Sequence, residues 1–194
     1  MPPQRRPLPS SLLFGRTFLR HPRMLGSVVP SSRFLISRIL RQADWGRTRV
    51  VVEAGPGVGT LTTAILDRLH HDGTVVAFEM NRTFVTHLRG EIADPRLAVL
   101  HRSAADAGPA LAERGTGQVD LLVSGIPLSG LTRQARLDLV AGWRQLLSPG
   151  GVMVVYQFTR SVVPDLRRVF GHVRQEFEPL NVLPAWVWRC EVPA

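Results

Sequence analysis

An acid followed by alternating glycines is the feature of this sequence with the clearest chemical meaning. The β-branched run 50–52 leads into Glu53, and the residues at every second position after it are Gly55, Gly57 and Gly59. In a turn between a strand and a helix, glycine lets the backbone touch a ligand, because a Cβ would block the ligand and forbid the turn's dihedral angles. A dinucleotide-binding turn would have its third glycine at position 60, which is threonine here. The turn therefore predicts a ligand-binding crevice of another type.

The next predicted strand ends in a second acid, Glu79, which comes 20 residues after Gly59. This is close to the spacing expected for an acid that holds a ribose. A carboxylate there can accept hydrogen bonds from both ribose hydroxyls, since ligands bind at the carboxyl ends of the strands in a doubly wound sheet. Met80 could pack on an adenine ring, because its thioether adapts to flat surfaces. The alternative for Glu79 is a cap on the following helix.

Two further strand ends complete the predicted crevice. After the third strand, Ser103 and the backbone of Ala104 could supply a donor and an acceptor for an adenine edge, whereas Asp106 is expected to cap the next helix. The residues after the fourth strand are expected to line a substrate pocket, and they are Ser124, Gly125 and Ile126.

Strands and helices alternate from residue 49 onward, which predicts an α/β domain with a parallel sheet and helices on both faces. Strands are expected at 49–54, 74–79, 97–101, 119–124 and 151–158, and helices at 60–71, 82–93, 106–114 and 131–147. A short helix from Pro164 to about Phe170 should precede two last strands, at 173–179 and 185–192. This terminal pair should give a seven-stranded sheet an antiparallel C-terminal edge.

The positive charge of the chain lies in its first quarter. The net charge is +9, and residues 1–49 hold ten arginines and one acid, while the remaining residues are neutral overall. Such a segment should meet an anionic surface, of phospholipid or of nucleic acid. We expect a basic N-terminal segment over residues 1–45 and a globular domain over 46–194.

Two N-terminal helices are expected in the basic segment. The first should run from Ser10 or Ser11 to about His21, with apolar residues on one side and arginines on the other. Such a helix can lie in a membrane interface, although an apolar stripe usually packs on its own domain. The second should be capped by Ser31 or Ser32 and end at Gly46.

Several classes of protein are disfavoured by composition. No apolar run approaches the roughly 20 residues that span a bilayer, and no secretory signal is expected. The single cysteine, Cys190, fits a reducing compartment. One cysteine and scattered histidines predict no metal site. We therefore expect a cytoplasmic protein.

Taken together, these segments resemble a known family. The pattern E-x-G-x-G-x-G is typical of class I S-adenosylmethionine (SAM) methyltransferases, which have a Rossmann-like fold. More closely, the chain resembles the bacterial phospholipid N-methyltransferases, which methylate phosphatidylethanolamine towards phosphatidylcholine. The resemblance covers most of residues 18–190 and rests on FLRHPRMLGSVVPSSR, VVEAGPGVGTLTTAIL, SGIPLSGLTRQAR, LSPGGVMVVYQFT and LNVLPAWVWR.

The resemblance implies SAM as the cofactor and S-adenosylhomocysteine as the product. The residues it implies for SAM binding are Glu53, Gly55, Gly57, Gly59 and Glu79, and Glu53 could help to hold the ammonium of the ligand. It also implies front helices that attach to the inner face of the cytoplasmic membrane, with phosphatidylethanolamine as the substrate. The chain departs from the family where Arg102-Ser103-Ala104 replaces Gly-Asp-Ala.

The loop after the fourth strand favours a lipid over a nucleobase. Adenine-N6 methyltransferases carry Asn/Asp-x-Pro-aromatic here, in which the polar side chain orients the amine and the ring stacks on the flipped base. The corresponding residues are Gly125 and Leu128, so both contacts are lost. Nucleic acid is thus an unfavoured partner. An RNA methyltransferase remains the second hypothesis, because the front segment is basic, and a non-catalytic SAM-binding membrane protein is the third.

The implied reaction is in-line methyl transfer to a neutral amine, for which proximity and alignment are the main resource. The substrate ammonium must first lose a proton, although a desolvated pocket lowers the pKa of an amine. The alternative proton acceptors are His21, Tyr156 and Asp106. The candidates for binding the lipid phosphate are Arg20, Arg23 and Arg33.

Overall fold

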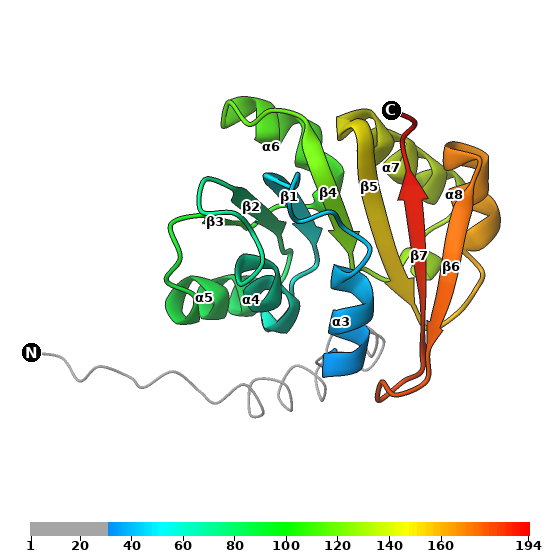
Figure 1. Ribbon diagram of the computed structural model, residues 1–194, viewed down its shortest axis with the longest axis horizontal. Coiled ribbons are helices and arrows are strands. Elements are labelled where there is room, and N and C mark those ends of the chain that lie inside the picture. Colours follow the sequence, from blue (N-terminus) through cyan, green and yellow to red (C-terminus); the bar gives the residue numbers. More distant parts are fainter. Residues whose placement is uncertain (1–30) are drawn as a thin grey trace, which may run out of the picture.

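A seven-stranded sheet lies at the centre of the computed structural model, which describes residues 31–194 (Figure 1). Its strands are β1 (Val50–Ala54), β2 (Thr74–Phe78), β3 (Leu97–Leu100), β4 (Val119–Ser124), β5 (Leu147–Gln157), β6 (Val173–Glu178) and β7 (Ala185–Glu191). They lie in the order β3-β2-β1-β4-β5-β7-β6. The first five run parallel, and β7 is antiparallel to both β5 and β6. The predicted α/β fold with an antiparallel C-terminal edge is confirmed.

Helices cover both faces of this sheet, which explains why its central strands are apolar on both sides. The helices are α3 (Arg33–Leu40), α4 (Thr60–Leu66), α5 (Arg82–Glu91), α6 (Ala107–Glu113), α7 (Arg133–Leu146) and α8 (Val163–Phe170). On one face α3 and α4 bury Leu35 and Ile65, and on the other α7 and α8 bury Trp143 and Leu166. None of the helices within residues 31–194 is long and apolar enough to cross a lipid bilayer.

Several elements end at other residues than the sequence predicts, because side chains bind the backbone there. Helix α3 stops at Leu40 instead of Gly46, and the indole of Trp45 donates a hydrogen bond of 2.7 Å to the Leu40 carbonyl. Helix α4 stops at Leu66 instead of residue 71, where the Arg96 guanidinium donates to the Leu66 carbonyl at 3.0 Å. Arginine thus binds a carbonyl that the helix itself leaves free.

The start of β5 was placed too late by the sequence pattern. The strand begins at Leu147 instead of residue 151, because Leu147 pairs with Val119 across a register shift in β4. The cap of α3 is settled in favour of Ser32, whose hydroxyl accepts from the Leu35 amide at 3.2 Å. The helix expected before His21 lies outside the described residues.

Helix α3 is fastened to the C-terminal strand pair by charge. The Arg38 guanidinium donates to Glu178 and to Glu176, in both cases at 2.8 Å. At the start of the helix, the Ser32 amide donates to the Asn181 side chain, also at 2.8 Å. These contacts join the first described helix to the last two strands of the chain.

A buried ion pair fixes the segment between β4 and α7. Arg136 is 9% exposed and bonds the carboxylate of Asp165, which is 2% exposed, through Nε at 2.7 Å and Nη2 at 2.6 Å. The same guanidinium donates to the carbonyls of Leu128 and Leu131 at 3.2 and 3.3 Å. One arginine therefore holds α8 and the loop after β4 in place.

Removing this arginine should destabilise the protein strongly. We expect Arg136→Ala to lower the free energy of unfolding by about 3 kcal/mol, since it leaves a buried carboxylate without its main partner. Arg133→Ala is the matched control, because Arg133 pairs with the same carboxylate at 3.1 Å while its side chain is 66% exposed. An exposed partner should contribute about 1 kcal/mol or less. Equal losses for the two variants in urea unfolding would contradict this assignment.

Candidate active site

The glycine turn between β1 and α4 has the backbone that only glycine adopts easily. Gly55, Gly57 and Gly59 have φ angles of 78°, 57° and 85°. A Cβ on Gly55 would lie 2.7 Å from a methyl carbon of Ile126, and one on Gly59 would lie 2.5 Å from Leu88. The turn is thus fixed both by its dihedral angles and by close packing.

Glu79 is tied to this turn. It is 8% exposed, and its carboxylate accepts from the Gly57 amide at 3.2 Å and from the Asn81 amide at 2.7 Å. Burial raises the pKa of Glu79 above its usual range, although the bonds from Asn81 and Gly57 oppose the shift. The next residue, Met80, is 72% exposed. The acid and the thioether predicted for a ribose and an adenine therefore stand together at the end of β2.

Glu53, at the end of β1, is more deeply buried. It is 2% exposed and accepts a hydrogen bond of 2.7 Å from the Thr62 hydroxyl on α4. Burial raises the pKa of Glu53 from 4.5 to about 7, and the charge of Glu79 adds to this while the Thr62 bond opposes it. A carboxylate poised at this pKa would be ionised by a neighbouring cation such as an ammonium.

The end of β3 differs in detail from the prediction. The Ser103 hydroxyl accepts from the Ala105 amide at 3.2 Å and so caps the short turn η2 (Ala104–Asp106). Asp106 occupies the cap position of α6, but its side chain makes no capping bond, so its predicted capping role is wrong. The Ala104 carbonyl accepts a hydrogen bond of 2.8 Å from the indole of Trp143, so this carbonyl is already engaged with α7.

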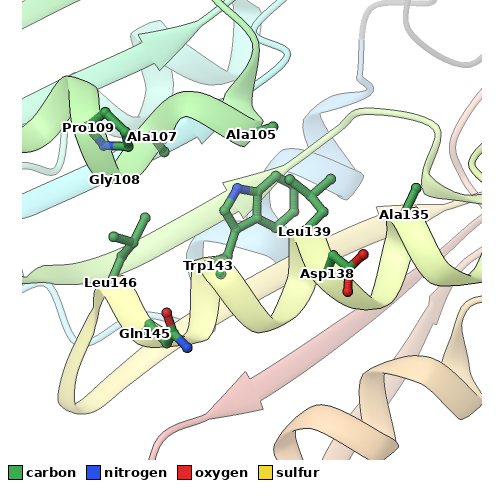
Figure 2. A pocket seen from close by; sticks show the side chains of 11 residues that line it. Ala105, Ala107, Gly108, Pro109, Ala135, Asp138, Leu139, Trp143, Gln145 and Leu146 are labelled. Carbon is green, nitrogen blue, oxygen red and sulfur yellow. The ribbon is translucent and has the colours of Figure 1, made fainter.

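A hollow of about 410 Å³ lies nearby, between α6 and α7 (Figure 2). Figure 2 shows Trp143 and Leu139 on α7 opposite Ala107 and Pro109 on α6. Its lining includes none of the residues predicted to bind the cofactor or the substrate. It is therefore distinct from the crevice formed by the glycine turn.

The loop after β4 is built around a tyrosine. A Cβ on Gly125 would lie 2.1 Å from the hydroxyl oxygen of Tyr156 and 2.7 Å from its Cζ. Burial and the charge of Glu53 raise the pKa of Tyr156 well above its usual range, so the phenol is protonated at neutral pH. Tyr156 is thus a hydrogen-bonding group here, which argues against its predicted role as a proton acceptor.

Neighbouring contacts lock this loop against the glycine turn. The buried amide of Gln157 donates to the Ile126 carbonyl at 2.7 Å, and the Ile126 side chain packs against Gly55. Ser124 is fully buried, and its hydroxyl has no hydrogen-bond partner within residues 31–194. Leu128 is fully buried in the core. The predicted cofactor turn and the predicted substrate loop are therefore in direct contact.

The remaining predicted residues are placed as follows. Arg33 is exposed at the start of α3, with its guanidinium 4.8 Å from the ring centre of Phe34. His21, Arg20 and Arg23 lie outside the described residues. Sequence reasoning missed several residues that shape the site, and they are Thr62, Arg136 and Gln157. The one available signal was their polarity within otherwise apolar stretches.

The raised pKa of Glu53 predicts a pH-dependent stability. The folded protein binds the extra proton between about pH 4.5 and 7, so the free energy of unfolding should fall as pH rises through this range. The loss has an upper bound of about 3 kcal/mol. Urea unfolding at pH 5, 6, 7 and 8 should show the slope in the wild type, and Glu53→Gln should remove it. Parallel profiles for the two proteins would refute the burial of this charge.

Glu79 should control cofactor affinity. Glu79→Ala removes the expected ribose acceptor and the support of the Gly57 amide, so we expect SAM to bind at least tenfold more weakly by calorimetry. Glu91→Ala, an exposed acid at the end of α5, is the control and should leave the affinity unchanged. An unaltered affinity in the Glu79 variant would remove the ribose assignment.

Known proteins match this chain either over part of its length or over nearly all of it. The ribosomal RNA adenine dimethylase family model matches residues 23–118, which end before β4. A ribosomal RNA small subunit methyltransferase A from Thermobifida fusca is 36% identical over 94 residues, 47% of this chain and 32% of that protein. These similarities are confined to part of the chain.

Two other similarities span nearly all of it. An ornithine lipid N-methyltransferase from Singulisphaera acidiphila is 33% identical over 180 residues, which are 92% of this chain and 94% of that protein. The fold matches the N-methyltransferase NodS from Bradyrhizobium japonicum with bound S-adenosylhomocysteine, with a TM-score of 0.70 and 12% identity over 95% of this chain and 99% of that one. The preformed glycine turn and its two buried acids fit SAM, which is the cofactor, with S-adenosylhomocysteine as product. The chain belongs to the class I SAM-dependent methyltransferases, in the family that includes the ornithine lipid enzyme.

Proposed function

We propose that this methyltransferase N-methylates the amine of a membrane-lipid headgroup, with phosphatidylethanolamine as the first candidate substrate. The loop after β4, residues 125–128, is called the acceptor loop here. The observation that carries the proposal is the contact in this loop between Gly125 and Tyr156, which gives the loop a shape suited to a small amine. The similarity to the ornithine lipid enzyme along almost the whole chain supports a lipid acceptor. Ornithine lipid, which also bears an amine, is the second candidate.

The same contact disfavours a nucleobase. An asparagine or aspartate at position 125 would place its Cβ 2.1 Å from the Tyr156 hydroxyl, so the polar side chain of the adenine enzymes would require Tyr156 to move. Leu128 is fully buried and offers no surface for stacking. Stacking contributes about 1–3 kcal/mol per base, and this contribution is missing.

Different residues of the chain have different roles in the proposed reaction. SAM, when bound, supplies an electrophilic methyl group on a sulfonium. The protonated hydroxyl of Tyr156 lies at the acceptor loop and can orient an amine by a hydrogen bond. Arg33, exposed on the first described helix, is a candidate for the lipid phosphate. The main contribution to the rate is then the alignment of amine and methyl group.

The group that accepts the amine proton must lie near the acceptor loop. Asp106 follows β3, which lies three strands from β4 in the sheet. Asp106 itself is exposed, and its neighbours Ala105 and Ala107 line the separate hollow between α6 and α7. Of the predicted proton acceptors, His21 is therefore favoured over Asp106 and Tyr156.

We further propose that the basic N-terminal segment holds the enzyme on the anionic inner face of the cytoplasmic membrane.

The proposal is tested by methyl transfer from labelled SAM. We expect label in vesicles of phosphatidylglycerol and phosphatidylethanolamine, and none where phosphatidylcholine replaces the ethanolamine lipid. Parallel arms contain ornithine lipid and ribosomal RNA. Tyr156→Phe should lower the rate about tenfold at unchanged SAM affinity, because only the hydroxyl is lost, while Phe158→Leu controls for altered packing.

Three outcomes decide between the candidate functions. Label in RNA alone would establish the second hypothesis, an RNA methyltransferase. Tight SAM binding without transfer to any arm would point to the non-catalytic hypothesis. Label in ornithine lipid alone would keep the lipid class and replace the ethanolamine headgroup.

A further inference from the structure

We infer that the tip of the β6–β7 hairpin, defined here as Leu180, Val182 and Leu183, inserts into the interface of an anionic phospholipid bilayer. The inference rests on the proposed function, since a lipid substrate requires the crevice to reach a membrane. It concerns a surface built on the C-terminal hairpin, next to the start of α3.

At the hairpin tip the apolar residues are exposed and the polar residue is buried, which is the reverse of the usual arrangement. Leu180, Val182 and Leu183 are 61%, 75% and 39% exposed, whereas Asn181 between them is 7% exposed. The Asn181 side chain donates to the Leu183 carbonyl at 2.9 Å and accepts from the Ser32 amide at 2.8 Å. The turn is thus held by inward hydrogen bonds, and it presents apolar side chains to the outside.

Exposed apolar residues gather at this place. Of the seven large hydrophobic residues exposed within residues 31–194, five belong to the tip or its surroundings, and these are Phe34, Phe177, Leu180, Val182 and Leu183. Exposed large apolar side chains gathered in one region mark a protein or membrane interaction site. The position of the tip and the charge around it distinguish between these two kinds of partner.

The tip lies at the same end of the sheet as the active site, where the parallel strands have their carboxyl ends. Trp186, at the start of β7, pairs with Gln157 at the carboxyl end of β5. The turn before it therefore projects beyond the edge that carries Gly55, Glu79 and Gly125. Figure 1 shows the β6–β7 connection and the N-terminal end of α3 together at this end of the molecule. A surface that the tip enters would face the crevice.

The charge around the tip favours an anionic bilayer. Exposed Arg160 stacks on the Trp186 ring at 4.8 Å, and Trp186 packs on Phe177 at 4.6 Å. Arginine and tryptophan side chains suit the membrane interface, where an apolar body and a polar head are both accommodated. The acids of β6 are paired with arginine, since Arg38 bonds both Glu176 and Glu178. Little free negative charge therefore remains to repel the lipid.

The part of the sequence that precedes the described chain is also positively charged. The described chain begins beside the tip, where the Ser32 amide bonds Asn181. The 30 residues that precede Ser31 contain five arginines and no acid. Each basic residue close to an anionic leaflet adds about 1 kcal/mol. Apolar insertion of the tip and electrostatic attraction by these arginines therefore favour the same anionic bilayer, as in other peripheral proteins that use two signals.

The first test is a fluorescent label on the full-length chain. Cys190 is the only cysteine and is fully buried, so a new exposed cysteine can be labelled selectively. An environment-sensitive dye on Val182→Cys should brighten and shift to the blue with vesicles of phosphatidylglycerol and phosphatidylethanolamine. The matched control is Gln118→Cys, which is exposed before β4 at the opposite edge of the sheet. Its dye should remain unchanged.

The second test replaces the tip. The variant Leu180→Ser/Val182→Ser/Leu183→Ser should bind these vesicles at least tenfold more weakly, with SAM affinity and the circular dichroism spectrum unchanged. Its methyl transfer to monomeric short-chain phosphatidylethanolamine should equal that of the wild type, since the crevice is untouched. A dye at position 182 that stays silent on vesicles would overturn the inference and leave the tip to a protein partner. Failure of the proposed function is distinguishable, because it would abolish transfer to the monomeric lipid in the wild type as well.

Discussion

The hydroxyl of Tyr156 fills the space in which any side chain at position 125 would begin. This one contact requires glycine after β4, and it joins β5 to the loop on which the acceptor must lie. Through Ile126 and Gly55 the loop reaches the glycine turn. The glycine turn, the loop after β4 and strand β5 are thus one packed unit.

Two buried acids give this unit its electrostatic character. Glu79 is held by backbone amides, whereas Glu53 accepts from the hydroxyl of Thr62. Within residues 31–194 neither acid has an arginine partner, in contrast to Asp165, which has two. An acid that is buried without a cation is costly in the free protein. Such an arrangement favours the binding of a ligand that brings its own positive charge.

The local parts of this site could be predicted from sequence, and the long-range parts could not. The glycine turn and Glu79 follow from short spacings, because one strand and one helix determine where they lie. The bonds from Gln157 to Ile126 and from Arg136 to Leu128 depend on side-chain directions between separate elements, which no spacing reveals. Asp106 was misassigned as a cap because Ser103, three residues earlier, already forms the turn. Polar residues inside apolar stretches were the signal that sequence reasoning left unused.

The bond between Ser32 and Asn181 spans 149 positions of the chain. Contacts of such separation form late, because the entropy of closing a long loop must be met before they stabilise anything. During synthesis the ribosome releases Ser32 long before Asn181, so α3 has no hairpin to dock on until nearly the whole polypeptide has emerged. The end of the molecule that combines α3 with the apolar tip therefore matures last, after the cofactor half of the sheet has had time to fold.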